Sequence, residues 1–168
     1  MKSTLILIVI ILAAALWWWS QNIKEEEPAP SLEAVTVYFL NTKNFATGLE
    51  PYETAVARNI PAGADPKAAV LAELMTGPSA AEQENGLALQ TSEATGLDFK
   101  FEPTSGLAQV YLKGGCDSRG STYTIGNLIS KNLRQFPEVK QVLIYDPEGS
   151  TLFPESGPLD SLPGCLQP

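Results

Sequence analysis

The residue types that most often carry out chemistry are scarce in this chain. It has no histidine and only two cysteines, Cys116 and Cys165, among 168 residues. Histidine is a frequent general base and a frequent ligand of zinc and haem. Its absence excludes the usual serine-triad, cysteine–histidine and histidine–metal mechanisms. Carboxylates, a serine–lysine pair and the two cysteines are the remaining candidates.

Two pairs of carboxylates have the composition of a glycosidase site, in which two acidic side chains flank the scissile bond. They are Glu82 with Glu84, and Glu93 with Asp98. Both pairs fall in predicted loops or on the polar side of a predicted strand, where carboxylates are normally solvated. We expect no catalytic role for them, and a hydrolase that uses a carboxylate pair remains an alternative function.

Two further patterns suggest a nucleophile or a phosphate site. Ser121 and Lys131 have the residue types of a serine–lysine pair, but their spacing does not place them side by side on a helix. The glycine-rich stretch 114–120 lacks the lysine and hydroxyl residues that follow the last glycine of a phosphate loop. We expect neither pattern to be a site, so no catalytic residue and no cofactor is predicted.

Acidic residues near the C-terminus offer oxygen ligands for calcium. Asp146, Glu148 and Asp160 lack the regular spacing of a calcium-binding loop. The two cysteines do not complete a zinc site without histidine. We therefore predict no metal site.

The N-terminal residues indicate export from the cytoplasm. Lys2 precedes an apolar run from Leu5 to Trp19, and the acidic stretch 25–27 follows it. This charge order is typical of a segment whose N-terminus stays inside. As a single-pass anchor, the run contributes apolar residues to the bilayer and a tryptophan belt to its outer interface; the residues concerned are Leu5, Ile10, Leu16, Trp17, Trp18 and Trp19.

A signal peptide cleaved after the alanines at 13–15 is the alternative interpretation of the same run, and it predicts a secreted protein. Both interpretations place the rest of the chain outside the cytoplasm. In an exported chain an even pair of cysteines indicates a disulfide, here between Cys116 and Cys165. It would close a loop of about fifty residues and contribute about 4 kcal/mol. Two free thiols are the alternative.

Composition limits the partners. The net charge is −8, which argues against nucleic-acid binding because phosphates require a basic surface. Hydrophobic residues make up 44% of the chain, which is sufficient for a folded core. We therefore expect protein, membrane or cell-wall partners and no nucleic acid.

The elements that position these residues alternate between strands and helices. Runs rich in β-branched and aromatic residues predict strands at 34–40, 52–60, 97–103, 107–113 and 139–145, and the third and fourth form a hairpin. Helical spacing predicts helices at 65–75, capped by Asp65, and at 121–136, capped by Ser121 or Thr122. The stretch 41–51 is a predicted loop, and 79–93 is a loop with weak helical tendency at 80–84.

The order β-β-α-β-β-α-β predicts an α/β (α+β) fold in one small domain. We expect a mixed sheet of about five strands with two helices on one face. The predicted organisation is a membrane or signal segment at 1–20, an acidic proline-containing linker at 21–33, the domain at 34–149, and an irregular tail at 150–168 that the disulfide ties to the domain.

Four short motifs occur in an order that suggests a known family. They are Val37-Tyr38-Phe39-Leu40, Arg58-Asn59-Ile60-Pro61, Leu74-Met75-Thr76-Gly77-Pro78, and the unit from Phe136-Pro137 through Val139 to Gly149. On these motifs the chain resembles the GerMN domain family, a sporulation and spore-germination module of bacterial envelope proteins. The resemblance covers about Val35 to Gly149 in a single copy.

The resemblance implies a small α/β module, similar to the ring-building motifs of secretion-type assemblies, outside the membrane. It implies no catalytic residues, because the family has none established. We expect a non-catalytic, membrane-tethered module that docks to another envelope protein or to itself by an open face or edge of its sheet. Binding of peptidoglycan or another wall polymer is the alternative binding function.

Overall fold

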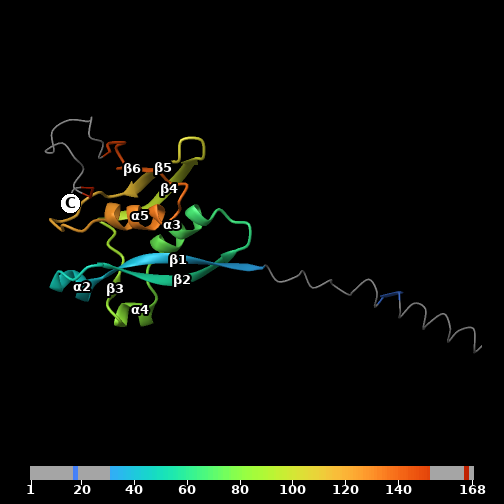
Figure 1. Ribbon diagram of the computed structural model, residues 1–168, viewed down its shortest axis with the longest axis horizontal. Coiled ribbons are helices and arrows are strands. Elements are labelled where there is room, and N and C mark those ends of the chain that lie inside the picture. Colours follow the sequence, from blue (N-terminus) through green and yellow to red (C-terminus); the bar gives the residue numbers. More distant parts are fainter. Residues whose placement is uncertain (1–16, 19–30, 152–164, 167–168) are drawn as a thin grey trace, which may run out of the picture. The chain divides into compact units, whose positions relative to one another are not determined.

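The computed structural model describes residues 17–18, 31–151 and 165–166 of the chain (Figure 1). Contacts divide the chain into two units, Met1–Pro30 and Ser31–Pro168. In the first unit Trp17 and Trp18 are helical and exposed. None of the described helices is both long enough and apolar enough to cross a membrane.

The prediction of a membrane or signal segment falls almost entirely outside the described residues. This holds for Leu5, Ile10, Leu16 and Trp19. The acidic linker lies outside them up to Pro30, and so does most of the C-terminal tail. The fold described below is that of the second unit.

Six strands form two three-stranded sheets in the second unit (Figure 1). The first sheet has the order β2-β1-β3 and is antiparallel; its strands are β1 (Leu32–Asn41), β2 (Glu53–Pro61) and β3 (Leu87–Ala88). The second has the order β4-β5-β6; its strands are β4 (Ala94–Glu102), β5 (Leu107–Gly114) and β6 (Gln141–Tyr145). Strand β4 is antiparallel to β5 and β6 is parallel to it, so this sheet is mixed.

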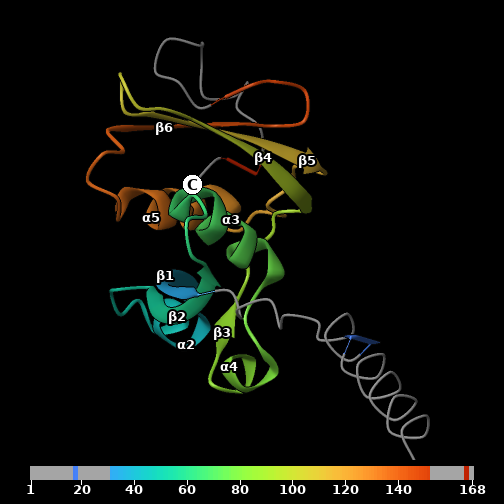
Figure 2. The same cartoon turned by 90° about the vertical axis from the view of Figure 1, so that its right-hand side faces the viewer.

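Four helices connect the strands. They are α2 (Thr42–Thr47), α3 (Pro66–Thr76), α4 (Ala80–Glu84) and α5 (Ile125–Arg134). Figure 2 shows α3 and α5 as a layer between β1 of the first sheet and the second sheet. The α+β class is confirmed, but the strands divide into two sheets where the sequence predicted one. The two helices therefore cover one face of the second sheet and also contact β1.

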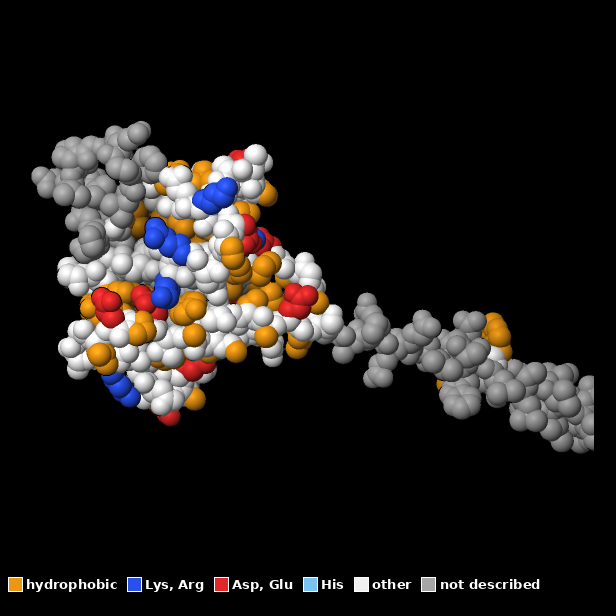
Figure 3. Space-filling model, in the orientation of Figure 1, with side chains coloured by type: hydrophobic (Ala, Val, Ile, Leu, Met, Phe, Trp, Pro, Cys, Tyr) orange, Lys and Arg blue, Asp and Glu red, His pale blue; other side chains and the backbone are white. Residues whose placement is uncertain are grey.

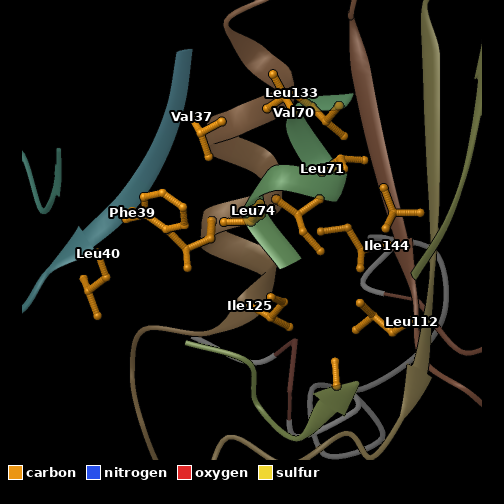
Figure 4. Packing of buried hydrophobic residues seen from close by; sticks show 14 of the residues in the cluster. Val37, Phe39, Leu40, Val70, Leu71, Leu74, Leu112, Ile125, Leu133 and Ile144 are labelled. Atoms are coloured by element: carbon orange, nitrogen blue, oxygen red, sulfur yellow. The ribbon is translucent and has the colours of Figure 1, made fainter. Parts of the chain in front are cut away.

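One hydrophobic core joins the helices to both sheets. Figure 4 shows Val37 and Phe39 of β1 pointing toward Leu74 of α3 and Leu133 of α5, with Ile144 of β6 on the opposite side. The first four of these side chains have no exposed surface, and Ile144 is 9% exposed. Each such side chain contributes about 1.5–3 kcal/mol when it is buried. The apolar stripes predicted for the two helices therefore both lie in this core.

The N-terminus of α5 differs from its prediction. The N-cap is Thr124, and its backbone N–H donates to Asn127 Oδ1 at 2.7 Å. Ser121 instead accepts from the backbone N–H of Tyr123 at 3.3 Å, and Thr122 lies outside the helix. Because Tyr123 is buried in the core, the helix begins after it, and the predicted cap at Ser121 or Thr122 is wrong.

The stretch predicted as a loop at 41–51 contains the short helix α2. Its N-cap is Asn41, whose side chain accepts from the backbone N–H groups of Lys43 and Asn44. The helix has six residues and none of them is buried, so it has no apolar stripe that a periodicity argument could detect. Capping by an asparagine side chain determines its position.

Candidate protein-docking edge

Strand β1 lies in the middle of the first sheet, with β2 on one side. On its other side, a residue of α5 and the C-cap of α5 form hydrogen bonds that a neighbouring strand would otherwise form. The Asn132 side chain accepts from the backbone N–H of Tyr38 at 2.8 Å and donates to its carbonyl at 2.9 Å. Gln135 Nε2 donates to the carbonyl of Thr36 at 3.0 Å. Strand β3 pairs with the end of β1 on the same side. This edge of β1 is therefore closed to the second sheet.

Strand β2 forms the outer edge of the same sheet. It pairs with β1 over its nine residues. Two backbone hydrogen bonds identify which opposed residues of β1 and β2 form hydrogen-bonded pairs. They run from Asn41 N–H to the Tyr52 carbonyl and from Ala62 N–H to the Ser31 carbonyl. By the alternation of an antiparallel ladder, Thr54, Val56, Arg58 and Ile60 direct their backbone groups at β1.

The intervening residues of β2 direct their backbone groups away from β1. These residues are Ala55, Ala57 and Asn59, and their side chains are exposed. Within the described part of the chain, no strand pairs with this edge. We call the outward backbone groups and side chains of Ala55, Ala57 and Asn59 the β2 edge.

The β2 edge lacks the charges that usually protect an edge strand. Proteins commonly place lysine or other charged side chains on exposed edges to prevent pairing with another chain. One of the two outer strands of the second sheet, β4, follows this rule with exposed charged residues at Asp98, Lys100 and Glu102; β6 is the other outer strand. Over the middle of β2, Figure 3 shows mainly hydrophobic and uncharged surface. Strands β2 and β4 therefore differ in how easily they can accept another strand.

The one cation of β2 is held against the core face. Arg58 donates to both carboxylate oxygens of Glu82, at 2.8 and 2.6 Å, and its Nε lies 3.5 Å from Glu73. Its guanidinium lies 5.5 Å from the centroid of the Phe39 ring. The hydrogen bonds from Arg58 lower the pKa of Glu82 to about 2, against the desolvation that opposes this shift. The charge of Arg58 is thus neutralised, and its Nη1 also donates to the outward carbonyl of Ala57 at 3.3 Å.

The acidic residue at the start of β2 is also held by neighbours. The Tyr123 hydroxyl donates to Glu53 Oε1 at 2.5 Å, and Lys131 Nζ lies 3.7 Å from Glu53 Oε2. Burial, and then the hydrogen bond to Glu53, raises the pKa of Tyr123 well above its ordinary value. Both charged side chains of β2 are therefore paired within the domain, and the edge between them is neutral.

Three of the four carboxylates in the candidate pairs contact cations. Glu82 binds Arg58, Glu93 accepts from Arg119 Nε at 2.9 Å, and Asp98 Oδ1 lies 2.6 Å from Lys113 Nζ. Glu84 is exposed. With a pKa of about 2, Glu82 is ionised near neutral pH and unsuited to act as a general acid. The structure assembles neither pair as an acid and a base.

The other sequence candidates have separate partners. Ser121 bonds to Tyr123 and Lys131 pairs with Glu53, so these contacts do not form a serine–lysine pair. In the loop 114–120, Arg119 is held by Glu93. Asp146 accepts from the backbone N–H of Ser150 at 2.7 Å, Glu148 is exposed, and Asp160 lies outside the described residues. No group of three or more residues suited to hold a metal ion occurs in the described ranges.

The two cysteines lie together in the structure. Cys116, in the loop before α5, and Cys165 form a disulfide with a Cα–Cα distance of 4.7 Å. The bond joins residues 49 positions apart, and Cys165 is completely buried. It holds Leu166, which is 3% exposed, beside the domain.

Three polar contacts between elements of the domain were not predicted from the sequence. They are the Asn132–Tyr38 pairing, the Arg58–Glu82 pair, and the contact of the nearly buried Lys67 with Glu138 at 2.9 Å. Asn132 carries a detectable signal, because it follows Leu128 by four residues and so lies on the apolar stripe of its helix. A polar residue on such a stripe is expected to have a buried partner. The other two pairs join distant segments, and no local pattern indicates them.

Comparison with known proteins gives a family match and one similar structure. A family model described as "Germane: Sporulation and spore germination" matches residues 36–152. A solved structure of the tandem GerMN domains of the sporulation protein GerM from Bacillus subtilis is similar, at 20% identity and a TM-score of 0.47. The match covers 88% of this chain and 49% of that chain, so this protein spans about half the length of the solved chain. No curated protein matches.

Proposed function

This chain belongs to the Germane family of sporulation and spore germination, and we propose that it is a non-catalytic module that docks to another protein. The observation that carries the proposal is the β2 edge. No strand among the described residues pairs with its backbone groups, of which the Ala57 carbonyl accepts from Arg58 Nη1 at 3.3 Å, and its exposed side chains are small and uncharged. Strand addition to such an edge is a common mode of protein recognition.

The register of β2 favours a second copy of this chain as the occupant. If two β2 strands pair antiparallel with Ala57 opposite Ala57, then Ala55 lies opposite Asn59 and Glu53 lies opposite Pro61. No two charged side chains oppose each other in that register, so the repulsion that like charges cause across strands does not arise. The edge is therefore self-complementary, and self-pairing would create a two-fold interface.

We place this module outside the cytoplasm, tethered to the cell membrane by the apolar run from Leu5 to Trp19. The support is the charge order around the run and the disulfide between Cys116 and Cys165, which suits an oxidising compartment. Fractionation of cells that produce the full chain tests this location. Recovery in the membrane fraction with an intact N-terminus is expected, and a soluble product that begins after residue 15 would replace the tether by a cleaved signal.

Photo-crosslinking in the native envelope tests the docking function. A photoreactive phenylalanine is placed at Ala57, and a control is placed at Lys100, which is exposed on the charged outer strand β4. We expect a crosslinked product of two copies from position 57 and little from position 100. A product with another envelope protein would identify a different docking partner. Crosslinking to wall polymer alone would replace the docking function by wall binding.

A further inference from the structure

A groove runs along the solvent side of α5, between β2 and β6. Its volume is about 530 Å³. The described lining residues come from the start of β2, from α5 and its N-cap, from β6 and from the disulfide-bonded C-terminal segment; they are Glu53, Thr124, Gly126, Asn127, Ser130, Lys131, Arg134, Val142, Ile144 and Leu166. Neither the β2 edge nor any of the candidate carboxylate pairs lines it. The groove is thus a second surface, distinct from the docking edge.

One part of the groove is apolar. It consists of Val142 and Ile144 of β6 together with Leu166. The backbone of α5 comes close to this part at Gly126, where an added Cβ would lie 3.6 Å from Leu166 Cδ2 and 3.7 Å from Ile144 Cδ1. The disulfide at Cys165 holds the neighbouring Leu166 in place. Val142 is partly exposed, so an apolar side chain of a ligand can contact this part of the groove.

The other part of the groove carries positive charge that the described residues do not balance. Of the three arginines, Arg58 is paired with Glu82 and Arg119 with Glu93. Arg134 has no carboxylate within ion-pair distance in the described part of the chain. Lys131 shares the groove with one carboxylate, Glu53, at 3.7 Å. The described lining therefore holds two cations and one acidic group.

Hydrogen-bond donors accompany these cations. Asn127 Oδ1 accepts from the backbone N–H and the hydroxyl of Thr124, which leaves its amide NH2 as a donor. The Ser130 hydroxyl makes no hydrogen bond with the described residues. In the space-filling view, lysine and arginine side chains lie over the region that α5 occupies in Figure 1 (Figure 3). A groove with donors in excess favours a ligand that carries acceptors, above all carboxylates.

We propose that the α5 groove binds an acidic peptide segment, with a carboxylate on Arg134 and an apolar side chain against Val142, Ile144 and Leu166. An anionic polymer is disfavoured, because phosphate chains are held by several cations in a row and this groove offers two. The apolar part, by contrast, suits an amino-acid side chain. The proposal adds a ligand site to the docking function and does not depend on the β2 edge.

The test is fluorescence anisotropy of the full chain in detergent with a fluorescein-labelled peptide of alternating glutamate and leucine. We expect Arg134→Gln to weaken binding about tenfold, as the loss of one charge-assisted hydrogen bond would. The matched control is Lys43→Gln, which removes an exposed cation on α2, away from the groove lining. It should leave the affinity within about twofold. A peptide with glutamine in place of glutamate should bind weakly.

Three results would overturn the proposal. They are failure of the acidic peptide to bind, equal affinity of wild type and Arg134→Gln, and displacement of the peptide by polyphosphate at lower concentration than by unlabelled peptide. The last result would assign the groove to an anionic polymer. Ala57→Lys, which blocks the β2 edge, should leave peptide affinity unchanged, so the failure of the docking function and the failure of this site are distinguishable.

Discussion

Asn132 of α5 pairs with the backbone of Tyr38 of β1 in the way that a neighbouring strand would. Its side-chain oxygen accepts from the Tyr38 N–H at 2.8 Å, and its nitrogen donates to the Tyr38 carbonyl at 2.9 Å. The same nitrogen donates to the Leu128 carbonyl at 2.9 Å. Together with Gln135 and β3, this completely buried amide closes one edge of β1, while β2 lies at the opposite edge of the sheet.

Removing this amide should destabilise the domain. Asn132→Ala leaves the N–H and carbonyl of Tyr38 without partners, and we expect a loss of about 2–4 kcal/mol in the free energy of unfolding, measured by equilibrium urea denaturation. The matched control, Asn59→Ala, removes an exposed asparagine on the β2 edge and should change this free energy by less than about 0.5 kcal/mol. Equal effects of the two substitutions would contradict the role assigned to Asn132.

The Arg58–Glu82 pair predicts a dependence of stability on pH. Because the folded-state pKa of Glu82 is lowered from 4.5 to about 2, its contribution is present above pH 4.5 and is lost as the pH falls toward 2. The Glu82 side chain is 21% exposed, so we discount the full shift and expect about 1–2 kcal/mol at neutral pH.

Denaturation of wild type and Glu82→Gln at several pH values measures this contribution. The variant should be less stable at pH 7 and should converge on wild type as the pH approaches 2. Glu84→Gln, on the same helix, should match wild type throughout, because Glu84 makes no ion pair within the described residues. A difference between wild type and Glu82→Gln that stays constant with pH would show that the ion pair is not its cause.

The disulfide should make a large contribution to stability. Residues 49 positions apart are joined, and in the chain-entropy model such a bond contributes about 4 kcal/mol. Mass spectrometry of the exported, unreduced protein should detect one peptide that links Cys116 to Cys165. Reduction should lower the denaturation midpoint of wild type and leave the Cys116→Ser, Cys165→Ser double variant unchanged. Two thiols that alkylate without reduction would refute the bond.

Local patterns in the sequence predicted the elements well. The five predicted strands and two predicted helices occur in the expected order, and the hairpin of β4 and β5 pairs Phe99 with Val110. Helix α3 begins at Pro66 with Asp65 as its N-cap, as predicted. These features depend on residues close together in the chain, where alternation, helical spacing and capping act directly.

The division into two sheets depends on contacts that no local pattern contains. Asn132 and Gln135 occupy the edge of β1 that a single sheet would have used, and they lie more than ninety residues from their partners in the chain. The start of α5 was ambiguous for a different reason. Ser121, Thr122 and Thr124 are all suitable N-caps, and the burial of Tyr123 against Glu53 selects the third.

The candidate docking site was predictable only in part. The strand that contains Ala55, Ala57 and Asn59 was predicted, and its low charge is visible in the sequence. Its position at the edge of a sheet is a property of the topology, and the inward orientation of Arg58 follows from the distant Glu82. The family resemblance thus led us to expect docking by an open face or edge of the sheet, and the sequence could not identify which one.

The most direct test of docking through the β2 edge is the oligomeric state of the full chain, measured by analytical ultracentrifugation in detergent. Ala57→Lys places a charge on the edge at an exposed position, where it should block strand pairing and leave the thermal unfolding temperature unchanged. Ala81→Lys, at an exposed position of α4, is the matched control. We predict that wild type and Ala81→Lys form dimers and that Ala57→Lys is monomeric. A dimer that persists in Ala57→Lys, or a wild type that stays monomeric at all concentrations, would contradict self-docking by this edge.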